Sequence, residues 1–329
     1  MPSVLWSRRD CLAAALSIGV APGALAAPTA MTTTSPLALI EAPSSLGLRP
    51  PRPGHEPGAW KAPAALHSAG LSRQLKAERV VSLPHPRYAF DAEPGTTVRN
   101  GHAMRAYSEA LADEVQHALA AGHFPLVIGG DCSVLLGMRR AGPSGLVHVD
   151  GHADFFHPGN YSTSVPGSAA GMDLALVTGR GDPLLTDWGP DRSPLVADAD
   201  VVQVGERDTA DPAYPFADYL RTAIHRLSIE RCLALGPAAA AQQALALVKP
   251  GRLWLHVDVD VLDQAVMPAV DSPGTPGFDF GQLGTLVRGL LASGRVVGAD
   301  VTIFDPELDT GGAIAQRLAA CLAESFGRA

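Results

Sequence analysis

The sequence predicts a single α/β domain of three layers, α/β/α, in which helices cover both faces of a mainly parallel central sheet. Short apolar runs rich in β-branched residues alternate with segments of helical periodicity after the first thirty residues, as in proteins whose strands are joined by helical crossovers. Clustered aspartates follow two of these runs, and ligands of parallel sheets bind beyond the carboxyl ends of the strands. The 329 residues contain no linker long enough to divide them, so we expect one domain.

The first half of the chain supplies four of the expected strands. Leu111, Val115 and Leu119 recur at helical spacing, and Gly122 ends the helix that contains them. A buried strand runs into Gly129-Gly130-Asp131, and a second helix follows that turn. The predicted strands span 37–41, 80–83, 124–128 and 145–149, a Pro- and Gly-rich loop spans 42–63, and the first long helix spans 107–121.

The second half repeats the alternation of apolar runs and helical spacing. Its predicted strands span 200–204, 252–257 and 296–301, and its predicted helices span 216–227, 238–248, 280–293 and 311–325. Because strands joined by helices pair in parallel, both faces of the sheet are expected to be covered.

Composition and charge argue against several classes of partner. The net charge is −8, charged residues make up 18% of the chain and no basic block is present, so we expect neither nucleic acid nor an anionic membrane surface to bind. Beyond residue 30, no window has the ~18 continuous apolar residues of a membrane span. Three widely spaced cysteines remain after Cys11, and this odd set predicts no disulfide framework.

Residues 1–30 differ from the rest and are predicted to be a leader that precedes a domain of residues 31–329. Ser7-Arg8-Arg9 opens the leader, and an apolar run to Leu25 with small residues after it is similar to a twin-arginine export signal. The alternative is a mis-assigned start, with translation beginning at Met31. The first interpretation places the protein in the periplasm, and the second places it in the cytoplasm.

Two strand ends carry clustered acidic residues. Asp150, His152 and Asp154 follow one apolar run, and Asp258 and Asp260 follow another. Alternate residues of an extended chain point the same way, so each set is expected to converge. Carboxylates that share a site repel one another, and two divalent ions would neutralise them. Ions that share carboxylates lower the pKa of a bridging water, whose hydroxide attacks an electrophilic carbon while Asp154 or Asp260 handles the proton.

Three ordered segments, GGDCS (129–133), DGHAD (150–154) and DVD (258–260), resemble the metal-binding motifs of the arginase/agmatinase (ureohydrolase) family. The resemblance covers nearly all of the chain after the leader. It implies an arginase-like fold, a binuclear manganese centre and hydrolysis of a non-peptide C–N bond in a guanidine or amidine. It also implies a small-molecule substrate and a homo-oligomer, a trimer or a hexamer. The implied metal ligands are Asp150, His152, Asp154, Asp258 and Asp260, with Cys132 at a sixth ligand position.

Three positions depart from the family pattern. Cys132 stands where the family has a histidine ligand, and we expect its thiolate to bind metal; the alternative is a buried, inert cysteine. A thiolate ligand admits Zn²⁺, Fe²⁺, Co²⁺ or Ni²⁺ beside Mn²⁺, and similar cysteines in hydroxyguanidine-hydrolysing relatives point to a specialised substrate. Ile303 takes the substrate-binding position of the glutamate that anchors the guanidinium, where Asp305 or Glu307 is a candidate replacement. Ala170 takes the position of a proton-shuttling histidine.

Further residues near these motifs have two interpretations each. His157 is a candidate for the missing shuttle or an ordinary loop histidine. Asp208 matches a family position that contacts the substrate, and the alternative is a loop-capping aspartate; Asn160 is a further substrate-binding candidate. His148 and His256 precede the acidic strand ends by two residues. They are either partners that orient the metal ligands or core histidines bonded to backbone groups.

Two other functional hypotheses remain open. A cysteine hydrolase would use Cys132 as nucleophile, His152 as base and Asp150 as the orienting group. A non-catalytic descendant of the family would keep the fold and bind metal without turnover. Metal content separates the cysteine hydrolase from a metal-dependent hydrolase, and activity on guanidines tests the non-catalytic hypothesis.

Overall fold

The computed structural model describes residues 35–161, 166–189, 194–208 and 217–327. The segment predicted to be a leader, residues 1–30, lies outside these residues, as does Met31. In the described part, no helix combines the length and apolar character needed to cross a membrane.

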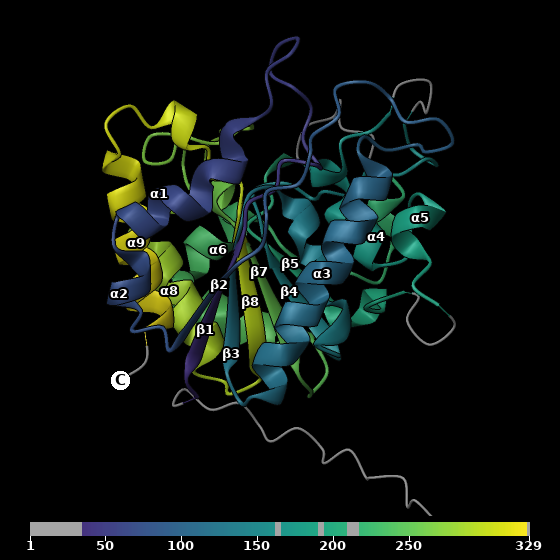
Figure 1. Cartoon of the computed structure of the whole chain (residues 1–329). Helices are drawn as coiled ribbons and strands as arrows, with labels where there is room; N and C mark the ends of the chain where they lie inside the picture. The colour runs from purple at the N-terminus through teal and green to yellow at the C-terminus, as the bar shows by residue number, and fades with distance from the viewer. Residues whose placement is uncertain (1–34, 162–165, 190–193, 209–216, 328–329) are drawn as a thin grey trace, which may run out of the picture.

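One sheet of eight strands runs through the middle of the molecule, and every neighbouring pair is parallel (Figure 1). Its strand order is β2-β1-β3-β8-β7-β4-β5-β6. The strands β3, β4, β7 and β8 are buried along their whole length, which explains why they read as continuous apolar runs. The strands are β1 Leu37–Ala42, β2 Arg79–Ser82, β3 Phe124–Gly129, β4 Gly145–Val149, β5 Val201–Val204, β6 His225–Leu227, β7 Leu253–Asp258 and β8 Val296–Thr302.

Helices cover both faces of the sheet, so the predicted three layers are confirmed (Figure 1). One face packs beneath Leu66 and Leu283, and the other beneath Leu111 and Leu135. The helices of the first face are α1 Ala62–Ser68, α2 Leu71–Gln74, α6 Ile229–Leu235, α7 Pro237–Leu247, α8 Phe280–Leu291 and α9 Ala313–Phe326. Those of the second face are α3 Gly101–Ala120, the 3-10 helix η2 Cys132–Arg140, α4 Asp173–Val177 and α5 Pro183–Thr186.

The prediction of a helix over residues 216–227 is wrong. Leu220, Ile224 and Leu227 have helical spacing, but the described part of this segment forms a short 3-10 turn, η6 Tyr219–Arg221, followed by strand β6. The strand pairs with the edge of β5 through Val202 and His225, so tertiary pairing overrides the local pattern. The helix after Gly129-Gly130-Asp131 is present as the 3-10 helix η2, whereas the short helices α1, α2, α4 and α5 were not predicted.

The candidate residues lie where the central strands end. β3, β8, β7, β4 and β5 are consecutive neighbours in the sheet. The segments that leave their carboxyl ends carry Cys132, Ile303, Asp258, Asp150 and Asp208, respectively. Parallel strands place these five exits at one edge of the sheet.

Candidate metal centre

Two similar turns bring the acidic residues together. β4 and β7 are neighbours in register, with Val149 opposite Val257. After each strand, the first aspartate accepts a 2.7 Å hydrogen bond from the backbone N–H two residues later, His152 N to Asp150 Oδ1 and Asp260 N to Asp258 Oδ1. These side-chain turns end the extended chain. The predicted convergence is therefore observed, but turns produce it and the alternation of an extended strand does not.

Both turns are closed by further contacts. Asp260 Oδ1 accepts a hydrogen bond from Gly151 N at 3.2 Å, which ties the second turn to the first. Asp154 has a left-handed backbone, with φ of 44°, a conformation that only a constrained non-glycine residue keeps. Asp208 accepts from Ala153 N at 3.1 Å and braces the same loop from β5.

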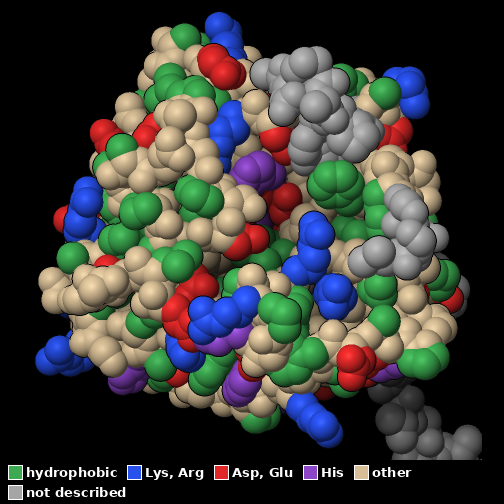
Figure 2. Space-filling view, turned by 90° about the horizontal axis from the view of Figure 1, so that it is seen from above, with side chains coloured by type: hydrophobic (Ala, Val, Ile, Leu, Met, Phe, Trp, Pro, Cys, Tyr) green, Lys and Arg blue, Asp and Glu red, His purple; other side chains and the backbone are tan. Residues whose placement is uncertain are grey.

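The predicted ligands lie in or beside the wall of a cavity of about 940 Å³. His152 Nδ1 lies 2.8 Å from Asp260 Oδ2, and ligand atoms of Asp150, His152 and Asp260 lie within 4.8 Å of one another. Seen from above, acidic and histidine side chains gather in a hollow of the surface (Figure 2). Five predicted ligands line the cavity directly, Cys132, His152, Asp154, Asp258 and Asp260, and Asp150 is buried beside them.

Cys132 enters the cluster from the first residue of η2. Asp131 caps this helix by accepting from Ser133 N at 2.9 Å. The Cys132 Sγ lies 2.8 Å from Asp258 Oδ2 and 3.5 Å from Thr302 Oγ1. Burial and the charge of Asp258 raise the pKa of the thiol well above its usual value. The sulfur is therefore a thiol unless a cation draws off its proton.

The electrostatics of the cluster fit divalent cations. Burial and neighbouring carboxylates raise the pKa values of Asp150, Asp154 and Asp258 well above normal. Burial also raises the pKa of Asp260, but the charge and hydrogen bond of His152 outweigh it, and the net direction is down. Asp150 Oδ2 is buried without a hydrogen-bond partner among the described residues. Closely spaced carboxylates with raised pKa values, and a buried carboxylate oxygen without a hydrogen-bond partner, are expected of metal ligands when no ion neutralises them.

A row of polar side chains crosses the sheet beneath the cluster. Gln203, His148, His256 and Asp300 occupy paired positions on β5, β4, β7 and β8. The two imidazoles stack with ring centres 4.5 Å apart, His148 Nδ1 bonds to Gln203 and His256 Nδ1 bonds to Asp300. Burial lowers the pKa of His148 to about 4, so this ring is neutral. Both histidines thus bind side chains and are not isolated in the core.

Asp173 joins this row to the metal cluster. It is the first residue of α4, is fully buried, and its carboxylate lies 3.2 Å from His148 Nε2 and 3.5 Å from His256 Nε2. Ligand atoms of Asp173, His256 and Cys132 lie within 4.8 Å of one another, and His256 Nε2 has no hydrogen-bond partner among the described residues. Burial raises the pKa of Asp173 to about 8. Sequence reasoning missed Asp173, because a five-residue helix leaves no periodic signal.

The cavity wall is apolar where the family resemblance implies an acidic anchor. Ile303 lines the cavity, is 3% exposed and has φ of 74°, held by a 2.7 Å hydrogen bond from its N–H to Gly130 O. Ala170 lines the wall as well. The proposed replacements have other partners: Asp305 accepts from Gly58 N and Glu307 N, and the Glu307 carboxylate pairs with Lys61 and His55.

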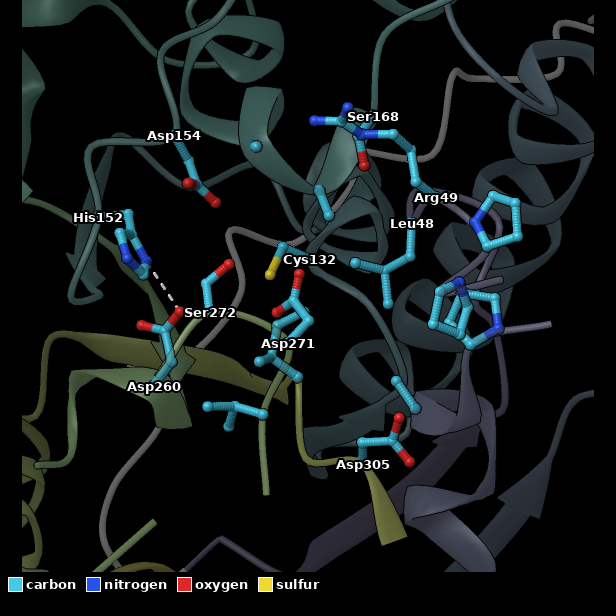
Figure 3. A pocket seen from close by; sticks show the side chains of 18 of the residues that line it. Leu48, Arg49, Cys132, His152, Asp154, Ser168, Asp260, Asp271, Ser272 and Asp305 are labelled. Atoms are coloured by element: carbon cyan, nitrogen blue, oxygen red, sulfur yellow. Dashed lines mark ion pairs between the residues drawn. The ribbon is translucent and has the colours of Figure 1, made fainter. Parts of the chain in front are cut away.

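His157 and Asn160 form a separate cluster. His157 Nε2 lies 2.6 Å from Asp218 Oδ2, and Asn160 Nδ2 donates to Phe155 O at 2.9 Å and to Asp218. Neither residue is among those that line the cavity. The cavity wall instead contains Asp271 and Arg49, which carried no motif in the sequence (Figure 3).

Comparison with known proteins agrees with this geometry. Residues 36–327 match the Arginase family. The chain is 27% identical to an arginase from Bacillus caldovelox over 307 residues, which cover 89% of this chain and 98% of that protein. It is 28% identical to a formimidoylglutamase from Nocardia farcinica over 74% of this chain and 73% of the relative. A guanidinopropionase from Pseudomonas aeruginosa is 33% identical over 60% of this chain and 58% of its own length.

Solved structures show the same architecture. The native structure of the Bacillus caldovelox arginase at pH 5.6 superposes with a TM-score of 0.75 at 25% identity, covering 90% of this chain and 99% of that one. The agmatine ureohydrolase of Thermoplasma volcanium superposes with a TM-score of 0.63 at 18% identity, over 90% of each chain, and shows the fold alone. The chain therefore belongs to the arginase family, the hydrolases that cleave C–N bonds of guanidino and amidino compounds.

Proposed function

We propose that the protein hydrolyses a C–N bond of a small guanidino or amidino compound at a centre of two divalent ions. The observation that carries the proposal is the gathering of buried carboxylates, an imidazole and a thiol along the cavity, with Asp150 Oδ2 lacking a hydrogen-bond partner within the described part of the chain. Bound ions would supply Lewis acidity and an activated water near neutral pH. The proposed ligands are Cys132, Asp150, His152, Asp154, Asp258 and Asp260.

The surrounding residues have distinct roles in this proposal. Asp260 orients the His152 ring through the 2.8 Å contact with Nδ1. Arg207 Nη2 donates to the Asp260 backbone oxygen at 2.8 Å and holds that turn. Asp154 faces the cavity, so we assign to it the uptake and return of a proton during hydrolysis.

The ligand set bears on the metal. Four carboxylates favour hard ions such as Mn²⁺, whereas the Cys132 sulfur and the His152 nitrogen admit Zn²⁺, Fe²⁺, Co²⁺ and Ni²⁺. We propose Mn²⁺ on the weight of the oxygen ligands. Metal analysis of the purified protein decides between these ions.

The cysteine-hydrolase hypothesis has little geometric support. The hydrogen-bond partners of Cys132 are Asp258 and Thr302, whereas His152 pairs with Asp260. A nucleophilic cysteine needs a base within hydrogen-bond reach and a lowered pKa, and the pKa of this thiol is raised.

A substrate panel tests the proposed activity. The protein, loaded in turn with Mn²⁺, Zn²⁺, Fe²⁺, Co²⁺ and Ni²⁺, is mixed with guanidino, hydroxyguanidino and formimino compounds, and release of urea, hydroxyurea, amide or ammonia is measured. We expect turnover of at least one compound that is lost on chelation and restored by metal. If no compound is hydrolysed with any of these metals, the result would favour the non-catalytic hypothesis.

A further inference from the structure

The cavity offers a cationic substrate no anion at the position where the family resemblance implies one. Ile303 is uncharged, and the carboxylates of Asp305 and Glu307 are occupied by backbone amides, Lys61 and His55. The acidic residues of the metal cluster are committed to the proposed ions. A guanidinium or amidinium therefore needs another carboxylate, because such cations bind planar carboxylates with paired hydrogen bonds.

Asp271 is a carboxylate of this kind. It lines the cavity, and its side chain is drawn among the lining residues in the close-up view (Figure 3). Its carboxylate is hydrogen-bonded by its own backbone N–H and, among the described residues, by no other side chain. The residue is accessible through the cavity although protein atoms surround the carboxylate, and burial with the charge of Asp260 raises its pKa to about 6. An approaching cation removes the cost of that isolated charge.

The loop that carries Asp271 is fixed at both ends. Gln264 N donates to Gly274 O at 2.8 Å, and Asp263 N donates to Phe278 O at 2.9 Å. Thr275 Oγ1 donates to Asp263 Oδ2 at 2.6 Å. The position of Asp271 relative to the metal cluster is thus set by the protein before any ligand binds, which lowers the entropy cost of recognition.

Arg49 is the counterpart at the other side of the cavity. Its side chain is exposed and lines the cavity, and its guanidinium makes no hydrogen bond or ion pair with any residue in the described part of the chain. In Figure 3 the guanidinium of Arg49 and the carboxylate of Asp271 are separated in the view. Arg52, the other arginine of the lining, contacts His55 Nδ1 at 3.5 Å, and His55 pairs with Glu307. Arg49 is therefore available to an anion that enters the cavity.

Apolar side chains line other parts of the same cavity. Leu48, Val270 and Ile303 are buried and contribute to the wall. We propose, on the basis of the hydrolytic function above, that the substrate is a guanidino or amidino acid. Its cation pairs with Asp271, its aliphatic part contacts the apolar wall, and its carboxylate pairs with Arg49.

The test compares two ligands that differ at one end. 4-Guanidinobutyrate carries a carboxylate where agmatine carries an aminomethyl group, and both carry the same guanidinium. Dissociation constants for the metal-loaded protein are measured by titration calorimetry, with kcat and KM wherever turnover occurs. The variants are Arg49→Gln and Asp271→Asn. Their controls are Arg73→Gln and Asp91→Asn, exposed residues outside the cavity.

We expect wild type to bind 4-guanidinobutyrate at least about tenfold more tightly than agmatine, because one charge-assisted hydrogen-bonded pair changes affinity by about this factor. Arg49→Gln should reduce this ratio to about threefold or less, while Asp271→Asn should weaken both ligands by about tenfold. Metal content and thermal unfolding should match wild type. The proposal is overturned if Arg49→Gln leaves the affinity ratio of the two ligands unchanged. It is also overturned if Asp271→Asn loses no more affinity than the control variants lose. Binding is read without turnover, so a missing hydrolytic activity is a separate result.

Discussion

Cys132 stands beside the acidic turn that follows β7, with its sulfur 2.8 Å from Asp258 Oδ2. Its pKa is raised by burial and by surrounding carboxylates, so a thiolate exists there only beside a cation. A dication in contact with the sulfur would reverse the sign of the local potential and deprotonate it. Ligation by Cys132 and occupancy of the metal site are therefore coupled.

Substitution of Cys132 separates a ligand from an inert core cysteine. The Co²⁺-loaded protein should show the near-ultraviolet absorption of a cobalt–thiolate bond, and Cys132→Ser should lose it. Cys132→His should raise the affinity for Mn²⁺, because an imidazole suits that ion better than a thiolate. The control variant is Cys321→Ser. Cys321 lies in α9 and donates a hydrogen bond to Phe280 O. An unchanged cobalt spectrum in Cys132→Ser would refute ligation.

The ligands and the substrate residues differ in how far the sequence predicts them. Asp150 and Asp258 stand out because each follows an apolar strand and is repeated two residues later by another potential ligand. Asp271 and Arg49 lie in irregular loops, where neither period nor spacing indicates which way a side chain faces. Asp173 required the tertiary structure, since only the folded chain brings the first residue of α4 to His148 and His256.

Strands β5, β4, β7 and β8 act together as a support for the metal centre. Their paired positions carry the polar row of Gln203, His148, His256 and Asp300, and α4 sets Asp173 against it. Polar groups that hold ligand-bearing segments in place affect metal affinity without contacting the substrate. The row lies two residues before both ligand turns, so a shift in the row displaces both.

Asp173→Asn tests this support. The amide keeps the shape of the side chain but cannot ionise, and we expect metal affinity to fall by about 10- to 100-fold with the fold retained. Competition with a calibrated chelator measures the affinity, and circular dichroism checks the fold. Asp182→Asn, which changes a cap on the neighbouring α5, should leave metal affinity at the wild-type value. Equal metal affinity in Asp173→Asn and wild type contradicts the supporting role.

At the scale of elements, the sequence locates strands better than helices. Seven strands are predicted within one residue at either end, because continuous apolar runs bounded by turns are characteristic of buried parallel strands. The eighth, β6, has only three residues, of which His225 and Arg226 are not buried. Its identity as a strand comes from pairing with β5, which no local pattern contains.

The whole molecule carries an electrostatic cost that metal should relieve. Between pH 6.5 and about 8, buried Asp173, with a pKa of about 8, retains a proton that the unfolded chain has released, and the raised pKa values of Asp150 and Asp258 act in the same direction. The folded state then binds more protons, so the free energy of unfolding falls as pH rises. His148, with a pKa of about 4 in the folded protein, opposes the trend only in the lower part of this window, where the unfolded imidazole, with a pKa of about 6.5, is still partly protonated.

We therefore expect the metal-free protein to unfold at a lower temperature at pH 8 than at pH 6.5. The metal-loaded protein should show a smaller change, because bound ions compensate the deprotonated carboxylates. Scanning calorimetry of both forms at the two pH values makes the comparison. A metal-free protein whose unfolding temperature rises over this range would show that the buried cluster does not govern its stability.

Assembly remains a prediction at this scale. The family resemblance implies a trimer or hexamer, and sedimentation of the purified protein measures the number of subunits. The segment predicted as a leader, residues 1–30, lies outside the described residues, so the two proposed locations also remain predictions.

The central claim is that two divalent ions, held by the ligands around Asp258, carry out the hydrolysis. Metal content per chain, measured by mass spectrometry after reconstitution and dialysis, tests it most directly when read together with turnover of an amidine. We predict that wild type binds two ions per chain and hydrolyses the amidine. Asp258→Asn should lose the bound metal and the activity, and Asp91→Asn should keep the metal and the activity. An Asp258→Asn protein that keeps two ions and full activity, or a wild-type protein that hydrolyses amidines without bound metal, would contradict the claim.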